Sequence, residues 1–135
     1  MSRSSRVQRV VGLILHVLVG GLMIFAGSGK AFGFAPEMIV KKMAEYGLGD
    51  KLVLIGVGEM VSAILLLTPL TMTLGVLLTS GFWGGVICIH MAHGEDIIMP
   101  SVLLLMTWAG AFLRDPLTFG RFFSSRKFET NEVAM

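Results

Sequence analysis

The sequence predicts an all-α protein: a bundle of four transmembrane helices, with a short interfacial amphipathic helix between helices 1 and 2. Apolar residues make up 54% of the 135 residues and charged residues only 15%, whereas a soluble domain carries about 25% charged residues. The apolar residues gather in four long runs separated by short polar segments. A chain with so few polar residues to coat a soluble surface is expected to lie in a lipid bilayer.

The composition also excludes two classes of function. The net charge is only +2, and it is too small and too scattered to indicate a protein that binds nucleic acid. Cys88 is the only cysteine, so the chain has no second thiol for an internal disulfide or for a thiol–disulfide relay.

The first apolar run follows a tail of nine residues that holds three arginines and no acid. Residues 10–29 are long enough to span, because about 20 helical residues cross a hydrocarbon core of roughly 30 Å. The alternative interpretation is a secretory signal peptide, since a basic segment precedes the apolar run. The apolar part of a signal peptide is typically only about 7–15 residues long, which favours the span.

Residues 30–51 hold seven charged residues and should leave the membrane core. Pro36 suits the first turn of a helix. After it, Ile39, Met43 and Tyr46 share one helix face at i, i+4 and i+7, away from the charged residues. This pattern predicts the short amphipathic helix at the membrane interface.

Three further apolar runs predict the remaining spans. The second contains a single charge, Glu59, and ends at Pro69, after which Thr71 is expected to cap the third helix and Asp96 to cap the fourth. The turn between spans two and three is too short for a domain, so these spans should form an antiparallel hairpin. The predicted organisation is a tail of residues 1–9, a membrane domain of residues 10–115 with spans at 10–29, 52–68, 72–91 and 97–113, and a tail of residues 116–135.

Both tails are predicted to be cytoplasmic, because Lys and Arg near span ends accumulate on that side. The two tails together with Arg114 carry seven such residues, against four in the 30–51 segment and none in the turn of residues 93–96. The C-terminal tail mixes phenylalanines with basic residues and should lie partly at the membrane surface. The expected location is a bacterial inner membrane, with the 30–51 segment outside.

This topology brings most of the membrane-embedded polar residues to the outer half of the bundle. Helix 1 ends outside near Lys30, while Glu59 lies on helix 2 roughly 12 Å below the outer surface. His16 lies in the inner half instead and is expected to be a hydrogen-bonded packing residue. The converging residues are Lys30, Glu59, His90, His93, Glu95 and Asp96.

Glu59 is the most informative of these residues, because an ionisable group near mid-helix costs about 2.5–3.5 kcal/mol on insertion scales. Lys30 and a protonated His90 are the candidate cations that would offset this cost. One interpretation is a structural ion pair between helices, and the other is a carboxylate that binds a ligand or transfers a proton. The sequence leaves both open, with no catalytic residue assigned. The candidate ligand or proton site consists of Lys30, Glu59, His90 and His93.

A metal site is a weaker hypothesis. His90 and His93 are three residues apart on one helix face. With Glu59 they would make a two-histidine, one-carboxylate site. The favoured expectation is that the chain holds no metal, because this spacing is not specific.

Small and soft residues predict how the helices pack. Gly29 and Gly33, like Gly81 and Gly85, are four residues apart, a spacing that lets helices approach closely. Trp83 lies near mid-span, where it should fill the bundle or line a cavity. The ten methionines suit an apolar ligand such as a quinone, but they also suit an ordinary core.

Several of these motifs together resemble a known family. Helix 1 ends in Gly-Ser-Gly-Lys-Ala-Phe-Gly at residues 27–33, helix 2 carries Gly-Val-Gly-Glu at residues 56–59, and His90 and His93 close helix 3. Over about residues 8–115 the chain resembles the DoxX-like family of small four-helix membrane proteins.

The resemblance implies a fold more than an activity. The family is named for a subunit of a thiosulfate:quinone oxidoreductase, some bacterial members are linked to oxidative-stress and sulfur-redox complexes, and distant relatives include a receptor-assembly chaperone. Lys30 and Glu59 match family positions, and His90 and His93 match more loosely. Ala31 stands where the family often has leucine.

Two hypotheses about function remain. A redox-linked membrane subunit would hold a quinone head group or a proton path among Lys30, Glu59 and His90, beside a membrane or redox protein partner. A non-enzymatic accessory or assembly protein would use the polar residues structurally and dock another membrane protein on its glycine faces. A transporter is a third possibility, but four spans leave little room for alternating access unless the chain forms a homo-oligomer.

Overall fold

The structure is a computed structural model that describes residues 5–117, and this part of the chain is helical without strands. The predicted features in residues 1–4 and in the tail beyond residue 117 lie outside the described residues. Short 3₁₀ turns at Gly49–Lys51 and Pro69–Thr71 precede the third and fourth α-helices. The α-helices are α1 (Arg6–Phe32), α2 (Glu37–Glu45), α3 (Leu52–Leu67), α4 (Met72–Ala92) and α5 (Ile98–Arg114).

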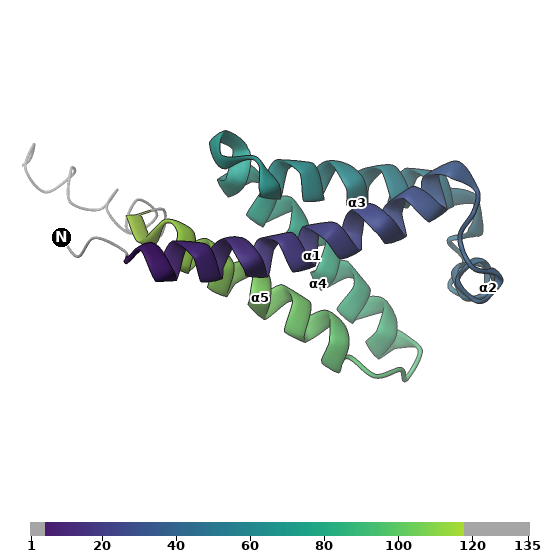
Figure 1. The fold of residues 1–135 in the computed structure, drawn as a ribbon. Coiled ribbons are helices and arrows are strands. Elements are labelled where there is room, and N and C mark those ends of the chain that lie inside the picture. The colour runs from purple at the N-terminus through teal and green to yellow at the C-terminus, as the bar shows by residue number, and fades with distance from the viewer. Residues whose placement is uncertain (1–4, 118–135) are drawn as a thin grey trace, which may run out of the picture.

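Four of these helices form a bundle, and the short α2 lies at one end of it (Figure 1). The long α1 packs against α3 and α5, and α4 packs against the same two helices. Figure 1 shows α3 and α4 meeting at their shared turn and diverging toward the end where α2 lies. The predicted all-α class and the predicted amphipathic helix between the first two long helices are therefore confirmed.

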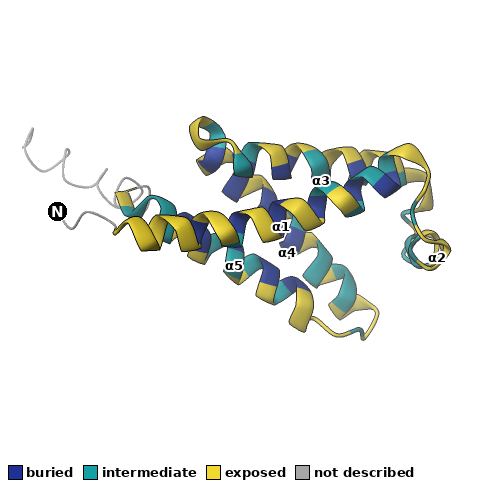
Figure 2. Cartoon of the chain, viewed as in Figure 1, coloured by how far each residue is buried: buried dark blue, intermediate teal, exposed yellow. Residues whose placement is uncertain are grey.

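The core lies between the four long helices. Val19 and Met23 of α1 and Ala63 and Leu66 of α3 are fully buried, and Trp83 of α4 is 5% exposed. Figure 2 shows the buried residues on the inward faces and exposed residues along the outward faces. Many outward residues are large and apolar, so the outer surface of this bundle lacks the polar coat of a soluble protein.

Two of the long helices are long and apolar enough to cross a membrane. They are Arg6–Phe32 and the 24-residue segment Pro69–Ala92, which joins the second 3₁₀ turn to α4. In the most apolar 18-residue stretch of each segment, only 33% and 28% of the residues are buried. The core helix of a soluble protein is mostly buried. The apolar α5 has 17 residues and α3 has 16, which is at the short end for a span.

The ends of α1 follow from local chemistry. The Ser5 hydroxyl accepts a hydrogen bond from the backbone N–H of Gln8, and the Gln8 side chain accepts one from the backbone N–H of Ser5. This reciprocal pair satisfies two N–H groups that the helix leaves unpaired. At the other end Gly33 takes a left-handed conformation with φ of 82°, which glycine adopts without strain and which ends the helix.

The predicted caps of the later helices are wrong in detail. Thr71 stands at the N-cap position of α4, but its side chain caps no backbone N–H and donates instead to the Leu65 carbonyl oxygen at 3.0 Å. Asp96 lies one residue before the N-cap of α5, and its carboxylate accepts from the Ile98 backbone N–H at 2.9 Å. In both turns the tight connection between helices decides where the side chain points.

The glycine pairs predicted from their spacing are not the ones at which helices meet. A Cβ added at Gly81 or Gly85 would meet nothing within 4 Å, and Gly33 is the cap of α1. Close helix contacts occur instead at Gly27 with Gly56, Gly12 with Gly110, and Gly75 with Leu66. Spacing identifies a small-residue face, but only the packing shows whether that face meets a neighbouring helix.

Candidate functional site

Lys30 and Glu59 form a buried ion pair between α1 and α3. The Lys30 Nζ and Glu59 Oε2 atoms are 2.6 Å apart, and the two side chains are only 11% and 2% exposed. Lys30 belongs to the last turn of α1, and Glu59 lies in the middle of α3. The predicted convergence of these two residues is therefore present in the structure.

Two glycines bring the ion pair together. A Cβ on Gly27 would lie 2.8 Å from the Gly56 carbonyl oxygen and 3.3 Å from the Glu59 Cβ, and a Cβ on Gly56 would lie 2.8 Å from the Lys30 Cβ. The backbones of α1 and α3 therefore touch beside the pair. Glycine is required at both positions because any larger side chain would separate the helices.

The ion pair lies in the wall of a cavity with a volume of about 560 Å³. The cavity is open to the surface and lies between α1, α3 and α4, with residues of α2 and Met99 of α5 also in its lining. Its volume is within the roughly 300–1,000 Å³ range of small-molecule sites. Most of the lining is apolar; it includes Leu22, Ile39, Ile55, Phe82, Trp83, Val86, Ile89 and Met99.

Two aromatic residues of α4 border the ion pair. The Lys30 ammonium lies 5.8 Å from the centre of the Phe82 ring, a distance at which a cation is attracted to an aromatic face. The neighbouring Trp83 packs edge-on against Phe82. Among the described residues, the buried Trp83 indole N–H has no hydrogen-bond acceptor.

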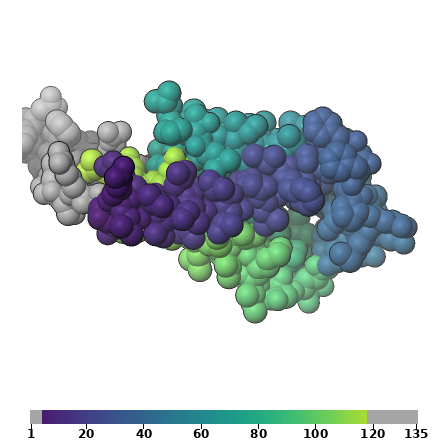
Figure 3. Space-filling view, in the orientation of Figure 1, coloured from purple at the N-terminus to yellow at the C-terminus, as the bar shows by residue number. Residues whose placement is uncertain are grey.

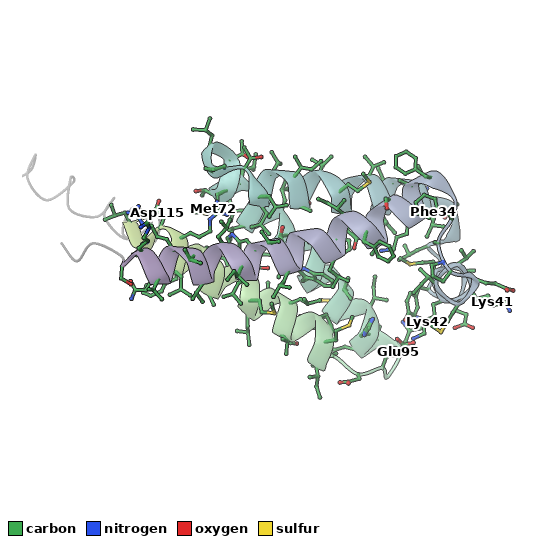
Figure 4. The ribbon with its side chains drawn as sticks, in the orientation of Figure 1. Phe34, Lys41, Lys42, Met72, Glu95 and Asp115 are labelled. Atoms are coloured by element: carbon green, nitrogen blue, oxygen red, sulfur yellow. The ribbon has the colours of Figure 1, made fainter. Side chains whose placement is uncertain are left out.

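A second polar cluster lies at the α2 end of the cavity. The Tyr46 hydroxyl donates to the Glu95 carboxylate at 2.6 Å, and Lys42 donates to the same oxygen at 3.2 Å. Figure 4 shows the Lys42 and Glu95 side chains meeting between α2 and the turn that follows α4. We call these contacts of Glu95 with Tyr46 and Lys42 the α2 latch.

The α2 latch shifts the pKa of two groups outside the expected spans. Burial and the hydrogen bond to Glu95 raise the pKa of Tyr46 to about 12. The hydrogen bonds from Tyr46 and Lys42 hold the pKa of Glu95 below its usual value. The latch is therefore strongest with Tyr46 protonated and Glu95 ionised.

The two histidines lie at the α2 end but do not join the ion pair through hydrogen bonds. His90 lines the cavity, and its Nδ1 donates to the Asp96 carbonyl oxygen at 2.7 Å while its Nε2 lies 3.9 Å from the Glu95 carboxylate. The Nδ1 of His93 donates to the Ile89 carbonyl oxygen at 2.9 Å, and its ring packs on Tyr46. Glu95 and Asp96 thus lie beside His90, as the topology predicted.

The metal hypothesis gains no support from this arrangement. Within residues 5–117, no group of three or more His, Cys, Asp or Glu side chains is placed to hold a metal ion. Glu59 faces Lys30, whereas each histidine uses Nδ1 for a backbone carbonyl. Glu59, His90 and His93 therefore do not form the two-histidine, one-carboxylate set.

A polar cluster at the opposite end of the bundle joins three helices. His16 Nε2 donates to the Thr107 carbonyl oxygen at 2.9 Å, and its Nδ1 accepts from Arg114 at 2.8 Å. Arg114 also donates to the Leu66 carbonyl oxygen at 3.1 Å. His16 is the predicted hydrogen-bonded packing residue. Arg114 enters the sequence prediction only as one of the basic residues near the span ends.

Tyr46 and Lys42, the partners that complete the outer site, are not predicted by the sequence pattern. Tyr46 had been placed on the apolar face of α2, and Lys42 had been counted only as a surface charge. No local signal joins them to Glu95, which is separated from Lys42 by 53 positions and from Tyr46 by 49. Their role depends on how α2 lies across the end of the bundle.

Comparison with known proteins agrees with this architecture. No curated protein and no solved structure matches the chain. The family model described as the DoxX-like family matches residues 14–110. This match runs from α1 to α5 and includes Lys30, Glu59 and the residues that line the cavity. Since the family model covers well over half of the sequence, the chain belongs to the DoxX-like family.

Proposed function

We propose that this DoxX-like chain crosses the membrane four times and binds a small, mostly apolar molecule with a polar head group in the bundle cavity. The head group lies at the Lys30–Glu59 pair, and a quinone of a redox-linked membrane system is the proposed ligand. The observation that carries the proposal is a buried ion pair, 2.6 Å long, in the wall of a mainly apolar cavity of about 560 Å³.

Four spans are supported by the outer surfaces of the two shorter helices. On α3, Val53, Leu54 and Ile64 are each more than half exposed, and on α5 so are Leu105 and Phe112. Both helices pack beside the two long apolar helices. A bundle that exposes apolar residues on every long helix is stable when lipid surrounds it.

The sidedness proposed is the one predicted from the charges, with both tails in the cytoplasm. The beginning of α1 and the end of α5 lie at the same end of the bundle, and α2 lies at the other (Figure 1). Arg6 and Arg9 mark the first end, and the tail sequence beyond residue 117 adds more basic residues. A bacterial inner membrane is the proposed location.

The ion pair is suited to a neutral head group. The opposite charges of Lys30 and Glu59 compensate each other, so the cavity presents an N–H donor and a carboxylate acceptor without net charge. The apolar lining stabilises an apolar ring or chain because it takes that group out of contact with polar surroundings. A quinone matches both features, because its ring is apolar and its carbonyl oxygens accept hydrogen bonds.

Quinone binding is tested with purified protein in lipid nanodiscs. We expect decylubiquinone to quench the tryptophan fluorescence of the wild type saturably. We expect Glu59→Gln to weaken binding roughly tenfold, because the Lys30 ammonium, which is the donor to a quinone carbonyl, loses the carboxylate that positions it. The matched control is Glu37→Gln, which makes the same change in the exposed Glu37–Lys41 pair. Absence of saturable quenching in the wild type, or equal affinity in Glu59→Gln, would contradict the proposal.

A second candidate function is an accessory or assembly protein for another membrane protein. It is favoured by one observation: Gly81, Gly84 and Gly85 form an open face on α4 that no residue of the described chain fills. The exposed Cys88 lies on the same helix and allows crosslinking without added cysteines. Under this hypothesis a thiol-specific crosslinker in native membranes captures one defined partner through Cys88, whereas a lone monomer or a homo-oligomer argues against it.

A further inference from the structure

Three glycines border the cavity on adjacent helices and leave a gap between them. Gly58 of α3 and Gly81 and Gly85 of α4 all line the cavity, and all three are exposed. A Cβ added at any of them would meet nothing within 4 Å. We call this gap the glycine window.

The glycine window follows from the way α3 and α4 diverge. Near their shared turn the two helices are in close contact, because Gly75 packs directly on the backbone of Leu66. Toward the α2 end the helices separate (Figure 1). Gly58 of α3 and Gly81 and Gly85 of α4 lie on the stretches that separate, and a Cβ at any of them would meet nothing within 4 Å.

The same cavity is bordered by α2 at one end. Ile39, Met43 and Tyr46 of α2 line the cavity there, and the α2 latch ties α2 to Glu95 through bonds of 2.6 and 3.2 Å. The cavity therefore has α2 beside it at one end and the exposed Gly58, Gly81 and Gly85 along its α3–α4 side. A cavity of about 560 Å³ has the size of a small-molecule site, so the long polyprenyl tail of a membrane quinone would extend beyond it.

We infer that the cavity is loaded sideways from the bilayer through the glycine window. Its ligand is a membrane-dissolved molecule whose head group lies at Lys30–Glu59 and whose apolar tail lies in the window and continues into lipid. This inference rests on the proposed ligand site and adds to it the class of ligand and the route of entry. A tail in the window remains in apolar surroundings along its whole length, so binding does not transfer it through water.

A second opening competes with this route. Figure 3 shows a hollow between α1, α2 and the green C-terminal half of the bundle. On this side the cavity is lined by Leu22 of α1 and Met99 of α5, whose side chains are 42% and 59% exposed. Long flexible side chains can fill that opening, whereas glycines cannot close the window.

The test compares two probes in nanodiscs, decylubiquinone and the same quinone head group without a tail. We expect Gly85→Leu and Gly58→Leu, which place a side chain in the window from either helix, to weaken decylubiquinone binding about tenfold. Binding of the tail-less head group should change little. Gly84→Leu is the matched control, because Gly84 has equally open space but does not line the cavity.

Two results would overturn the window while leaving the ligand site intact. One is wild-type affinity for decylubiquinone in both window variants; the other is an equal loss of both probes, which would mean that the leucines only fill the cavity. If Leu22→Trp instead weakens the binding of decylubiquinone but not that of the tail-less head group, the apolar tail leaves the cavity between α1 and α5. If the wild type binds neither probe, the proposed quinone site itself fails.

If the wild type binds neither probe, a measurement without quinone still tests whether lipid chains enter through the glycine window. Trp83 lines the cavity and is one of two tryptophans, so Trp108→Phe leaves it as the only reporter. In vesicles of phosphatidylcholine with brominated acyl chains, we expect quenching of Trp83 that Gly85→Leu reduces and Gly84→Leu does not, relative to unbrominated vesicles. Equal quenching in all three proteins would show that lipid chains do not reach the cavity through this gap.

Discussion

Both ends of the bundle contain glycines and buried polar side chains, but the helices pack differently at the two ends. At the end near the tails, His16, Arg114 and the carbonyl groups of Leu66 and Thr107 bond to one another, and a Cβ on Gly110 would overlap the His16 ring. At the α2 end, the Lys30–Glu59 pair faces a cavity, and Gly85 has open space. The first end is a closed joint between three helices, and the second leaves room for another molecule.

This difference shows that a polar residue inside the bundle does not by itself indicate whether its role is structural or functional. At the closed end each polar atom is used to connect helices, so the residues have a structural role. At the open end the ion pair joins α1 to α3, but no side chain of residues 5–117 fills the apolar cavity beside it. A functional site is therefore indicated by unfilled space next to the polar group, and not by the polar group alone.

The largest expected effect comes from removing one member of the buried ion pair. Lys30→Met should lower the free energy of unfolding by about 3–5 kcal/mol, because it leaves the Glu59 carboxylate buried without its cation. The double variant Lys30→Met with Glu59→Leu should recover most of this loss. Thermal unfolding in detergent, followed by tryptophan fluorescence, measures both.

The control for this prediction is Lys41→Met, which removes the cation of the exposed Glu37–Lys41 pair. Such surface pairs contribute little to stability, so no measurable change is expected. An unfolding midpoint for Lys30→Met equal to that of the wild type would show that the ion pair does not join α1 to α3.

An intermediate effect should separate the closed end from the open end. Gly110→Ala should destabilise the protein by about 1–3 kcal/mol, because the new methyl group displaces the His16 ring from its partners. Gly85→Ala should be neutral or should stabilise it by up to about 1 kcal/mol, because alanine favours the helix and meets nothing. The same thermal unfolding assay applies, and similar losses in both variants would remove the distinction between the two ends.

The smallest expected effect concerns the α2 latch. Tyr46 is the only tyrosine, so the ultraviolet absorbance of its phenolate follows this residue directly. We expect the pKa of Tyr46 to lie near 12 in the wild type and closer to its ordinary value of 10 in Glu95→Gln. A pKa that is the same in both proteins would contradict the hydrogen bond to Glu95.

The sign of the pH dependence follows from the two shifts. The raised pKa of Tyr46 stabilises the latch below pH 10, and this contribution is lost as the pH rises toward 12. The lowered pKa of Glu95 stabilises the latch above its ordinary value of 4.5, and this contribution is lost as the pH falls below that value. Protease cleavage of the 30–51 segment should therefore increase at both extremes.

Much of the fold was predictable because it follows from local patterns. Long apolar runs and a proline before an amphipathic segment indicate where the helices lie. The convergence of Lys30 with Glu59 was also predictable, since antiparallel helices of known length place these positions at similar depth. The sequence left open whether that pair is structural or part of a ligand site.

Residue types and their spacing are enough to specify the helices, their apolar character and the position of each charged residue along its helix, because these depend on one helix at a time. Which glycines touch a neighbouring helix and which border empty space is known only from the packed bundle, because it depends on how the helices rotate and diverge. The binding of Tyr46 and Lys42 to Glu95 is likewise known only from the packed bundle. Those contacts join segments about fifty residues apart, and no local interaction specifies them.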